Sequence, residues 1–287
     1  MDARKLSRFA TCEDYLACPV CGDALSLDGT CLACSAGHRF DIARQGYVNL
    51  LRGKHNHDVY DRESFASRRT VFESGLYAPI ADAVCKALEE ALGELPTRTT
   101  QPLVVDAGCG EGYFSSVVRK RTQARVCAFD ISRDSIQLAA VREPEDGIAW
   151  LVADLAAIPL QTGVATAVLD IFSPARYNEF HRILKPGGRV IKVVPTANHM
   201  HEVRALAAGS LQQHDYSNQR VLDHFAASCT PLARHTVSNT IALTPELRDA
   251  LIAMTPLLFS VDTAAIDWSG LTHATVEAEV LVGTWNA

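Results

Sequence analysis

A cluster of metal-binding side chains near the start of the chain constrains the fold most. Two cysteines stand in the turn Cys18-Pro-Val-Cys21-Gly, and Cys34 and His38 follow close behind. Thiolate and imidazole are the ligands that tetrahedral zinc prefers, and a Cys-Pro-x-Cys-Gly turn brings two sulfurs to one side. A segment of about forty residues buries too little apolar surface to fold unaided. We therefore expect a small module in which a zinc ion takes the place of a hydrophobic core.

The second pair of ligands is left open by the spacing. Cys31-Leu-Ala-Cys34 is itself a CxxC pair, whereas Cys34-Ser-Ala-Gly-His38 offers a cysteine and a histidine. Either choice gives four protein ligands and leaves no position for water or substrate, so the zinc is expected to be structural. The chain has nine cysteines and no apolar leader, which favours metal binding over a disulfide framework. Four of them lack partners at ligand spacing and are expected to be packing residues: Cys12, Cys85, Cys127 and Cys229.

From residue 101 onward, short apolar runs alternate with helical periods. Strands are expected at residues 103–106, 125–130, 148–152, 165–172 and 189–194, and helices at 113–120, 134–141 and 178–184. This alternation predicts an α/β fold with a doubly wound, mostly parallel sheet that binds ligands at the carboxyl ends of its strands. We divide the chain into a zinc module (1–53), a hinge and helical linker (54–100) and a catalytic domain (101–287).

A glycine-rich turn, Asp106-Ala-Gly108-Cys-Gly110-Glu-Gly112, joins the first of these strands to a helix. Glycines let the backbone approach a ligand closely, and the start of a helix offers unpaired amides. Asp130 ends the next strand, where a carboxylate can accept both hydroxyls of a ribose, and Asp154 ends the third, where it can reach an adenine edge. The alternative is that Asp130 and Asp154 are ordinary turn residues.

These motifs resemble those of the class I S-adenosylmethionine methyltransferases, which have a Rossmann-like fold. Leu184-Lys-Pro-Gly-Gly188 matches the turn before a late strand of that class, and the loop lacks the final spacing of the dehydrogenase pattern G-x-G-x-x-G. The resemblance implies that the cofactor is S-adenosylmethionine. The residues implied to bind it are Asp106, Gly108, Gly110, Glu111, Gly112, Tyr113, Asp130, Ile131, Asp154 and Leu155.

The N-terminal half narrows the resemblance. The cysteine motifs, the run Phe40-Asp-Ile-Ala-Arg-Gln-Gly-Tyr-Val-Asn-Leu-Leu51 and the later Phe172-Ser-Pro-Ala175 are similar to the RlmA type of 23S rRNA (guanine-N1)-methyltransferases over most of residues 15–200. The resemblance implies Cys18, Cys21, Cys34 and His38 as zinc ligands, a module that helps to grip RNA, a guanine in a 23S rRNA hairpin near the peptide tunnel as substrate, and a homodimer. Composition and spacing alone do not identify guanine.

Neutral guanine carries a proton on N1, so methylation there needs a base or a strong acceptor. Asp170, at the end of the fourth strand, is the candidate base; the alternative is that it faces a helix amide or solvent. Phe172-Ser-Pro174 stands where amino-methyltransferases often have Asn-Pro-Pro-Tyr, which suits a ring nitrogen better than an exocyclic amine. Phe172 and Tyr113 can flank a flipped base. Arg44, Tyr47 and Asn49 can contact RNA. The alternative is that Tyr47, Val48 and Leu50 attach the zinc module to the catalytic domain, which we expect for Val48 and Leu50.

The net charge of −6 argues against a generally basic RNA-binding surface. Residues 39–69 hold seven Lys/Arg against four acids, and a second basic group comprises Arg119, Lys120, Arg121, Arg125 and Arg133. Each group is either an RNA contact or a solvated face. The acidic charge keeps a small-molecule methyltransferase as the alternative, and a non-catalytic zinc-dependent RNA-binding factor is the third. No apolar window or signal peptide is evident, so we expect a cytoplasmic protein with no membrane contact.

Overall fold

The computed structural model describes residues 2–53, 62–93, 101–143, 147–211 and 216–285. Its centre is an eight-stranded sheet in the order β10-β11-β9-β8-β5-β6-β7-β4. The middle strands are parallel and β11 runs antiparallel to both of its neighbours. Their bounds are β4 Tyr47–Asn49, β5 Leu103–Ala107, β6 Arg125–Asp130, β7 Ile148–Val152, β8 Ala165–Ile171, β9 Leu184–Pro195, β10 Thr230–Ala242 and β11 His273–Thr284. The doubly wound sheet predicted from the sequence is confirmed.

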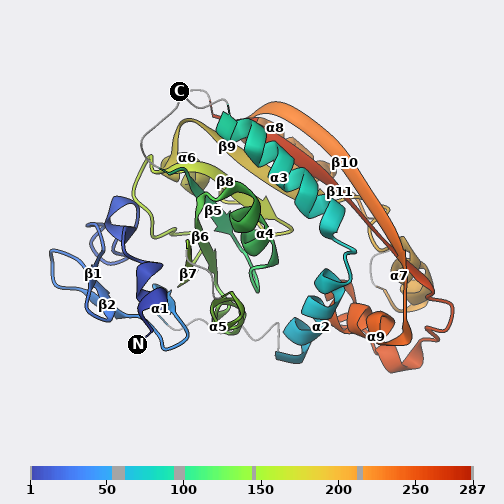
Figure 1. Ribbon diagram of the computed structural model, residues 1–287. Helices are drawn as coiled ribbons and strands as arrows, with labels where there is room; N and C mark the ends of the chain where they lie inside the picture. Colours follow the sequence, from blue (N-terminus) through green and yellow to red (C-terminus); the bar gives the residue numbers. More distant parts are fainter. Residues whose placement is uncertain (1, 54–61, 94–100, 144–146, 212–215, 286–287) are drawn as a thin grey trace.

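Helices cover both faces of this sheet (Figure 1). One face carries α3 (Ala78–Gly93), α4 (Tyr113–Thr122) and α5 (Arg133–Arg142), and the other carries α6 (Tyr177–Ile183) and α8 (Gln219–Ser228). Neighbouring residues of one strand therefore enter different cores: Val104 packs with the first group of helices and Val105 with the second. Coverage on both faces explains why β5, β7 and β8 are buried along their whole length.

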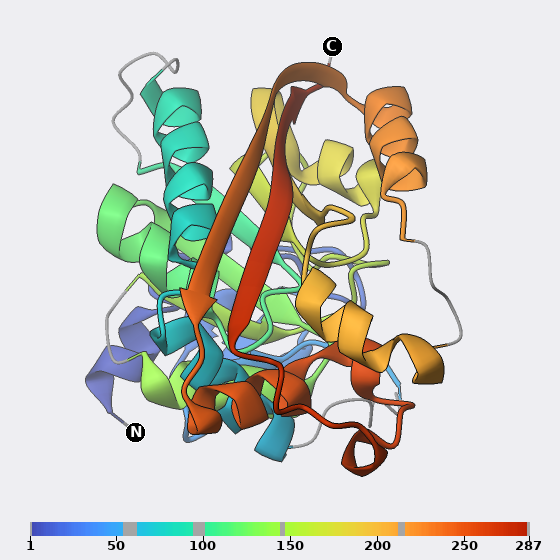
Figure 2. The same cartoon turned by 90° about the vertical axis from the view of Figure 1, so that its right-hand side faces the viewer.

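A further group of helices lies beyond one end of the sheet, where α2 (Arg62–Glu73) packs against α9 (Pro245–Met254) and α7 (His201–Ala207) lies near β11 (Figure 1). Figure 2 looks onto the long antiparallel strands β10 and β11, with α3 on one side and α8 on the other. Short 3-10 turns at Ala208–Ser210, Pro256–Leu258 and Thr263–Ala265 complete this part. No helix in the described ranges is long and apolar enough to cross a membrane.

The N-terminal module is small and nearly all irregular or extended. It contains α1 (Ala3–Ser7), a 3-10 turn (Cys12–Asp14) and a three-stranded antiparallel sheet of β1 (Ser26–Asp28), β2 (Cys31–Ala33) and β3 (Arg39–Asp41). The polypeptide then crosses to the main sheet and forms its edge strand β4, which runs parallel to β7 with Val48 opposite Leu151. The backbone N–H of Leu50 extends the pairing by donating to the carbonyl of Val152 at 2.9 Å.

Strand β4 lies within the run Phe40–Leu51, and it shows the surroundings of Tyr47, Val48 and Leu50. Val48 and Leu50 are 0% and 3% exposed, which confirms that they join the module to the catalytic domain. Tyr47, however, is also only 3% exposed, and its hydroxyl accepts a hydrogen bond from Nε of Arg133 at 3.0 Å. Of the two roles left open for Tyr47, the structure favours attachment of the module over RNA contact, because the pairing with β7 turns its ring into the core.

Removing the Leu50 side chain tests how firmly the module is attached. We expect Leu50→Ala to lower the free energy of unfolding by about 2–5 kcal/mol, because a buried leucine leaves a cavity as well as lost apolar contact. Leu51→Ala is the matched control, since the neighbouring side chain is only partly buried and should cost clearly less. Urea titrations followed by circular dichroism give both values. Equal losses in the two variants would contradict the described packing of the edge strand.

Candidate metal centre and active-site cleft

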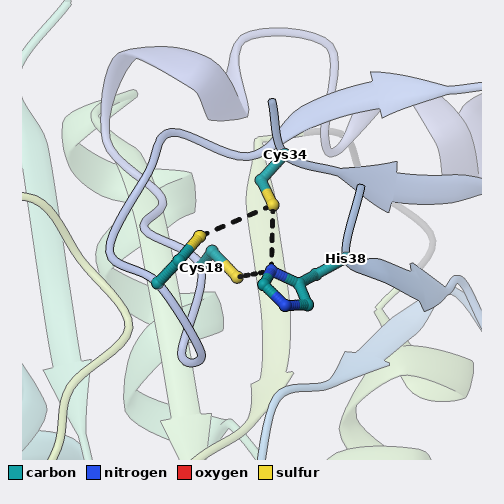
Figure 3. Close-up of side chains that lie close together, drawn as sticks. Cys18, Cys34 and His38 are labelled. Atoms are coloured by element: carbon teal, nitrogen blue, oxygen red, sulfur yellow. Dashed lines mark hydrogen bonds between the residues drawn. The ribbon is translucent and has the colours of Figure 1, made fainter. Parts of the chain in front are cut away.

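Four metal-binding side chains converge in the N-terminal module. Cys18 and Cys21 come from the turn before β1, Cys34 follows β2 and His38 precedes β3. Their ligand atoms all lie within 4.8 Å of one another. Figure 3 shows the sulfurs of Cys18 and Cys34 facing Nδ1 of His38, at 3.6 and 3.3 Å. The sulfurs of Cys21 and Cys34 are 3.6 Å apart.

These separations suit a tetrahedral zinc ion. Zinc bonds of about 2.3 Å to sulfur and about 2.0 Å to nitrogen place neighbouring ligand atoms about 3.5–3.8 Å apart. Cys31 is outside the group: its sulfur donates to the carbonyl of Asp28 at 3.2 Å and accepts from Nη2 of Arg39 at 2.8 Å. Of the two ligand sets that the spacing allowed, the structure thus assembles the one with three cysteines and His38.

The glycine-rich loop lies between β5 and α4. Its three glycines have positive φ, at +80° for Gly108, +55° for Gly110 and +81° for Gly112, a conformation that other residues rarely adopt. At Gly112 space is limiting as well, because a Cβ there would lie 2.3 Å from the Trp150 ring. The loop is tied down where β6 ends, since the amides of Gly108 and Cys109 both donate to the carbonyl of Phe129.

Three carboxyl groups surround this loop. The two oxygens of Asp130 accept from the amides of Gly110 at 3.0 Å and Ser132 at 2.8 Å, which leaves further lone pairs for a ligand. Asp106 accepts from the Ser115 hydroxyl at 2.5 Å, and burial raises the pKa of Asp106 to about 7. Burial also raises the pKa of Asp130 and Glu111, although Arg68, 3.8 Å from Glu111, opposes the shift at Glu111.

A cavity of about 420 Å³ opens in front of the loop. All the residues expected to bind the cofactor line it except Gly112, which packs behind the loop against Trp150. The cavity also takes residues from elsewhere in the chain that the motif does not include, among them Arg68, Phe72, Phe114, Ser173 and Arg176. The sequence placed Arg68 and Phe72 in the helical linker, where Arg68 is a candidate contact for RNA or for a cofactor carboxylate; nothing in the sequence pointed Phe72 to this cavity.

A second cavity of about 370 Å³ adjoins the first, and Arg68, Phe72, Phe172 and Ser173 line both. Its other walls come from the ends of β9 and α9 and from the segment that leads into α7. They include Tyr77, Lys192, His199, Met200, Arg204, Tyr216 and Met254. Sequence analysis did not identify these residues, because they follow no motif and are brought together by the fold.

Asp170 lies at the base of these two cavities without being part of either lining. Its carboxylate is 0% exposed, pairs with the Lys192 ammonium at 2.7 Å and accepts from the Ser173 hydroxyl at 2.6 Å. Burial raises the pKa of Asp170 to about 6, and Lys192 opposes that shift. Asp170 is buried and does not face solvent, which was one of the alternatives to a catalytic role. Its role as a base stays a prediction, but Lys192 and Ser173 stand between it and the cavities.

Two aromatic residues that the sequence analysis assigned to base stacking have different surroundings. Tyr113 already stacks on Phe72, with ring centroids 4.5 Å apart and planes 5° from parallel. Phe172 lines both cavities and has a φ of +54°, which is unusual for a residue with a side chain. Of the two, Phe172 has the position that a ligand can reach from either cavity.

The five basic residues between positions 119 and 133 form ion pairs or hydrogen bonds with other residues of the chain. Arg121 pairs with Asp82 and Glu89, Lys120 with Glu143, and Arg125 with Asp14. Arg119 donates to the carbonyls of Gln123 and Ala124, and Arg133 bonds to Tyr47. In the first basic group, Arg39 pairs with Asp28 and Arg69 with Glu73. These contacts weaken the case for either group as a dedicated RNA-binding surface.

Two family profiles match the chain. The profile described as "RlmA, N-terminal", a zinc ribbon, matches residues 16–58. The profile described as "Methyltransferase domain" matches residues 104–188. The first match covers the cysteine cluster and β4, and the second extends from β5 through β8 into β9.

Three curated relatives match most of the chain. The 23S rRNA (guanine(748)-N(1))-methyltransferase of Streptomyces fradiae is 32% identical over 84% of this chain and 85% of its own length. A Micromonospora griseorubida protein to which 23S rRNA (guanine-N1)-methyltransferase activity is provisionally assigned is 32% identical over 88% and 89%. A Bacillus subtilis protein with the same provisional assignment is 31% identical over 93% and 95%.

Proposed function

This chain belongs to the family of 23S rRNA (guanine-N1)-methyltransferases, and from that membership we propose that it methylates N1 of a guanine in 23S rRNA with S-adenosylmethionine as methyl donor. The observation that carries the proposal is the similarity of the whole chain, zinc module and catalytic domain together, to relatives named for that reaction. A small-molecule methyltransferase would not account for the matched zinc ribbon.

The first cavity fits S-adenosylmethionine. Asp130 retains lone pairs for the two ribose hydroxyls, and Ile131, Asp154 and Leu155 stand beside it for the adenine. Oε1 of Glu111 is buried and has no hydrogen-bond partner in the described part of the chain, which supports a ligand donor there. The carboxyl groups of Asp106, Glu111 and Asp130 together favour a cationic ligand such as a sulfonium.

Zinc in the N-terminal module is proposed to be structural, with Cys18, Cys21, Cys34 and His38 as ligands. Four protein ligands complete the coordination, so the ion contributes folding energy and takes no part in the reaction. Resemblance to the family also supports a hairpin near the peptide tunnel as target and a homodimeric assembly. A ribosomal RNA substrate supports a cytoplasmic location.

A transfer assay tests the proposed substrate class. The purified protein is incubated with radiolabelled S-adenosylmethionine and either 23S rRNA that lacks its own modifications or total small-molecule extract. We expect radiolabel in the acid-precipitated RNA. Digestion with nuclease before precipitation should remove the label from the precipitate. Label that appears only in the small-molecule fraction would contradict the RNA substrate and support a small-molecule methyltransferase.

The raised pKa of Asp106 predicts a pH dependence of cofactor binding. With a pKa of about 7, Asp106 is mostly neutral at pH 5.5 and mostly charged at pH 7.5, so the cavity becomes more negative across this range. Affinity for cationic S-adenosylmethionine, relative to S-adenosylhomocysteine, should rise by roughly three- to tenfold. Titration calorimetry at the two pH values gives the ratio. Asp106→Asn should show a flat ratio; an equally steep one in that variant would contradict the assignment.

A further inference from the structure

His199 stands on the wall of the second cavity, in the segment between β9 and α7. Its Nδ1 lies 3.1 Å from the carbonyl oxygen of Glu277. A carbonyl only accepts, so Nδ1 must carry the proton, and the other ring nitrogen, Nε2, is left as an acceptor. No hydrogen bond to Nε2 occurs among the described residues. The fold thus presents a neutral imidazole with its acceptor nitrogen available at a cavity.

The surroundings of His199 suit a planar base. Its ring centroid is 5.5 Å from that of Phe172 and 6.2 Å from that of Tyr77. Phe172 is shared with the cofactor cavity, so a base lying against it has the reacting centre on one side and the imidazole on the other. Aromatic faces of this kind accept extruded bases in enzymes that modify nucleic acids.

Backbone strain is concentrated at the same place. Phe172 and Met200, the residue after His199, both have a φ of +54°. The other non-glycine residue with positive φ in the described ranges, Gln123, simply caps the end of α4. Strained residues persist where the surrounding structure holds them, and they cluster at sites that position a ligand. Here the strain fixes the two segments that carry Phe172 and His199.

We propose that the second cavity receives the target guanine and that Nε2 of His199 accepts its N1 proton, an inference that rests on the proposed guanine-N1 methylation. S-adenosylmethionine, when bound, supplies the methyl group, whose bond to sulfur breaks and leaves its electron pair on sulfur as the bond to N1 forms. The N1–H bond breaks in the same event and its proton passes to Nε2. His199 then returns that proton to solvent.

The charges around His199 act on both partners of the proton transfer. Burial lowers the pKa of His199 to about 4, which keeps the ring neutral through the neutral range but also makes it a weaker base, so the transfer depends on positive charge that stabilises the guanine as N1 loses its proton. The charged groups that face the ring or share its cavity are Arg204 on α7, Lys192 on β9, Arg68 on α2 and Glu277 on β11. Lys192, held by Asp170, provides a positive charge for the guanine O6 as N1 loses its proton. Asp170 then acts as a positioning residue for Lys192.

His199→Gln tests the inference, with His201→Gln as the matched control because His201 is exposed and donates in the same way to a backbone carbonyl, that of Asn198. We expect the single-turnover rate of His199→Gln at pH 7 to fall roughly 10²- to 10⁴-fold, the usual range for loss of a general base. Cofactor affinity and hairpin affinity should stay within about threefold. The rate of the variant should rise with pH and be partly restored by added imidazole in a His199→Gly background, effects that a merely structural role would not produce.

Nitrogen-15 NMR of the labelled wild-type protein measures the charge and the protonated nitrogen of the His199 ring. This measurement requires neither a folded variant nor the cofactor. The His199 ring, assigned by comparison with His199→Gln or, if that does not fold, by through-bond correlation, should be neutral with the proton on Nδ1 at pH 7. A charged ring, or a proton on Nε2, would overturn the inference. So would a His199→Gln rate within threefold of wild type while the wild type methylates guanine N1. If the wild-type protein methylates no guanine, the proposed function fails and the inference fails with it.

Discussion

Replacing Asp130 with alanine is expected to weaken S-adenosylmethionine binding by roughly 10²- to 10⁴-fold. We propose that this carboxylate accepts the two ribose hydroxyls, and hydrogen bonds to a charged acceptor contribute about 1.5–3 kcal/mol each. The same carboxylate holds the amides of Gly110 and Ser132, so its removal also loosens the loop that faces the ligand. Both losses act on binding, and titration calorimetry measures their sum.

Two further variants separate the ligand contact from the loop contact. Asp130→Asn keeps one oxygen for the loop amides but loses the charge, and should fall between wild type and alanine. Asp154→Ala is the comparison: this carboxylate also lines the cavity and accepts from the amide of Ala156, and because it is proposed to contact an adenine edge and not the two ribose hydroxyls, we expect its loss to weaken binding less. The assignment of Asp130 would be wrong if Asp130→Ala, shown to be folded by its thermal unfolding curve, bound the cofactor within threefold of wild type.

Loss of one zinc ligand is expected to unfold the N-terminal module. Cys34→Ser should reduce bound zinc from about one ion per chain to nearly none, because structural zinc contributes on the order of 10–16 kcal/mol to folding of small domains. The three strands of the module are short, and its buried apolar residues pack in one cluster with the catalytic domain, so the zinc ion is expected to hold chiefly the loops that carry the ligands. Elemental analysis after dialysis gives the zinc content, and limited proteolysis shows whether residues 2–46 become cleavable.

Cys31→Ser provides the control for this experiment. Cys31 is a cysteine of the same module, but its sulfur contacts Arg39 and Asp28 and lies outside the metal cluster. The variant should therefore keep its zinc and its resistance to protease. Zinc loss in Cys31→Ser together with zinc retention in His38→Ala would support the four-cysteine site that the sequence spacing also allowed, because Cys34 is a ligand in both sets.

The parts of this protein that the sequence predicted are those whose chemistry is local. A zinc knuckle such as Cys18 to Cys21 and a cofactor loop such as Gly108 to Gly112 each require particular residues a few positions apart, so the pattern remains visible in the sequence. The alternating strands and helices are visible for the same reason, since burial on both faces demands long apolar runs.

Other features depend on contacts between distant segments, and these the sequence did not reveal. The sequence left RNA contact and attachment of the module open for Tyr47, and only the pairing of β4 with β7 shows that its ring is turned inward. Nothing in the sequence indicated that Lys192, from the adjacent strand β9, pairs with Asp170, whose role as a base stays a prediction. His199 belongs to no motif at all, and only the meeting of its segment with β8 and β11 gives it a partner and a cavity.

Primer extension on 23S rRNA tests the central claim most directly. The RNA, lacking its own modifications, is incubated with the protein and S-adenosylmethionine and then copied by reverse transcriptase. A methyl group on guanine N1 blocks Watson–Crick pairing, so we predict an arrest one nucleotide before a single guanine that requires both protein and cofactor. The absence of any arrest, from protein that measurably binds the cofactor, would contradict the account.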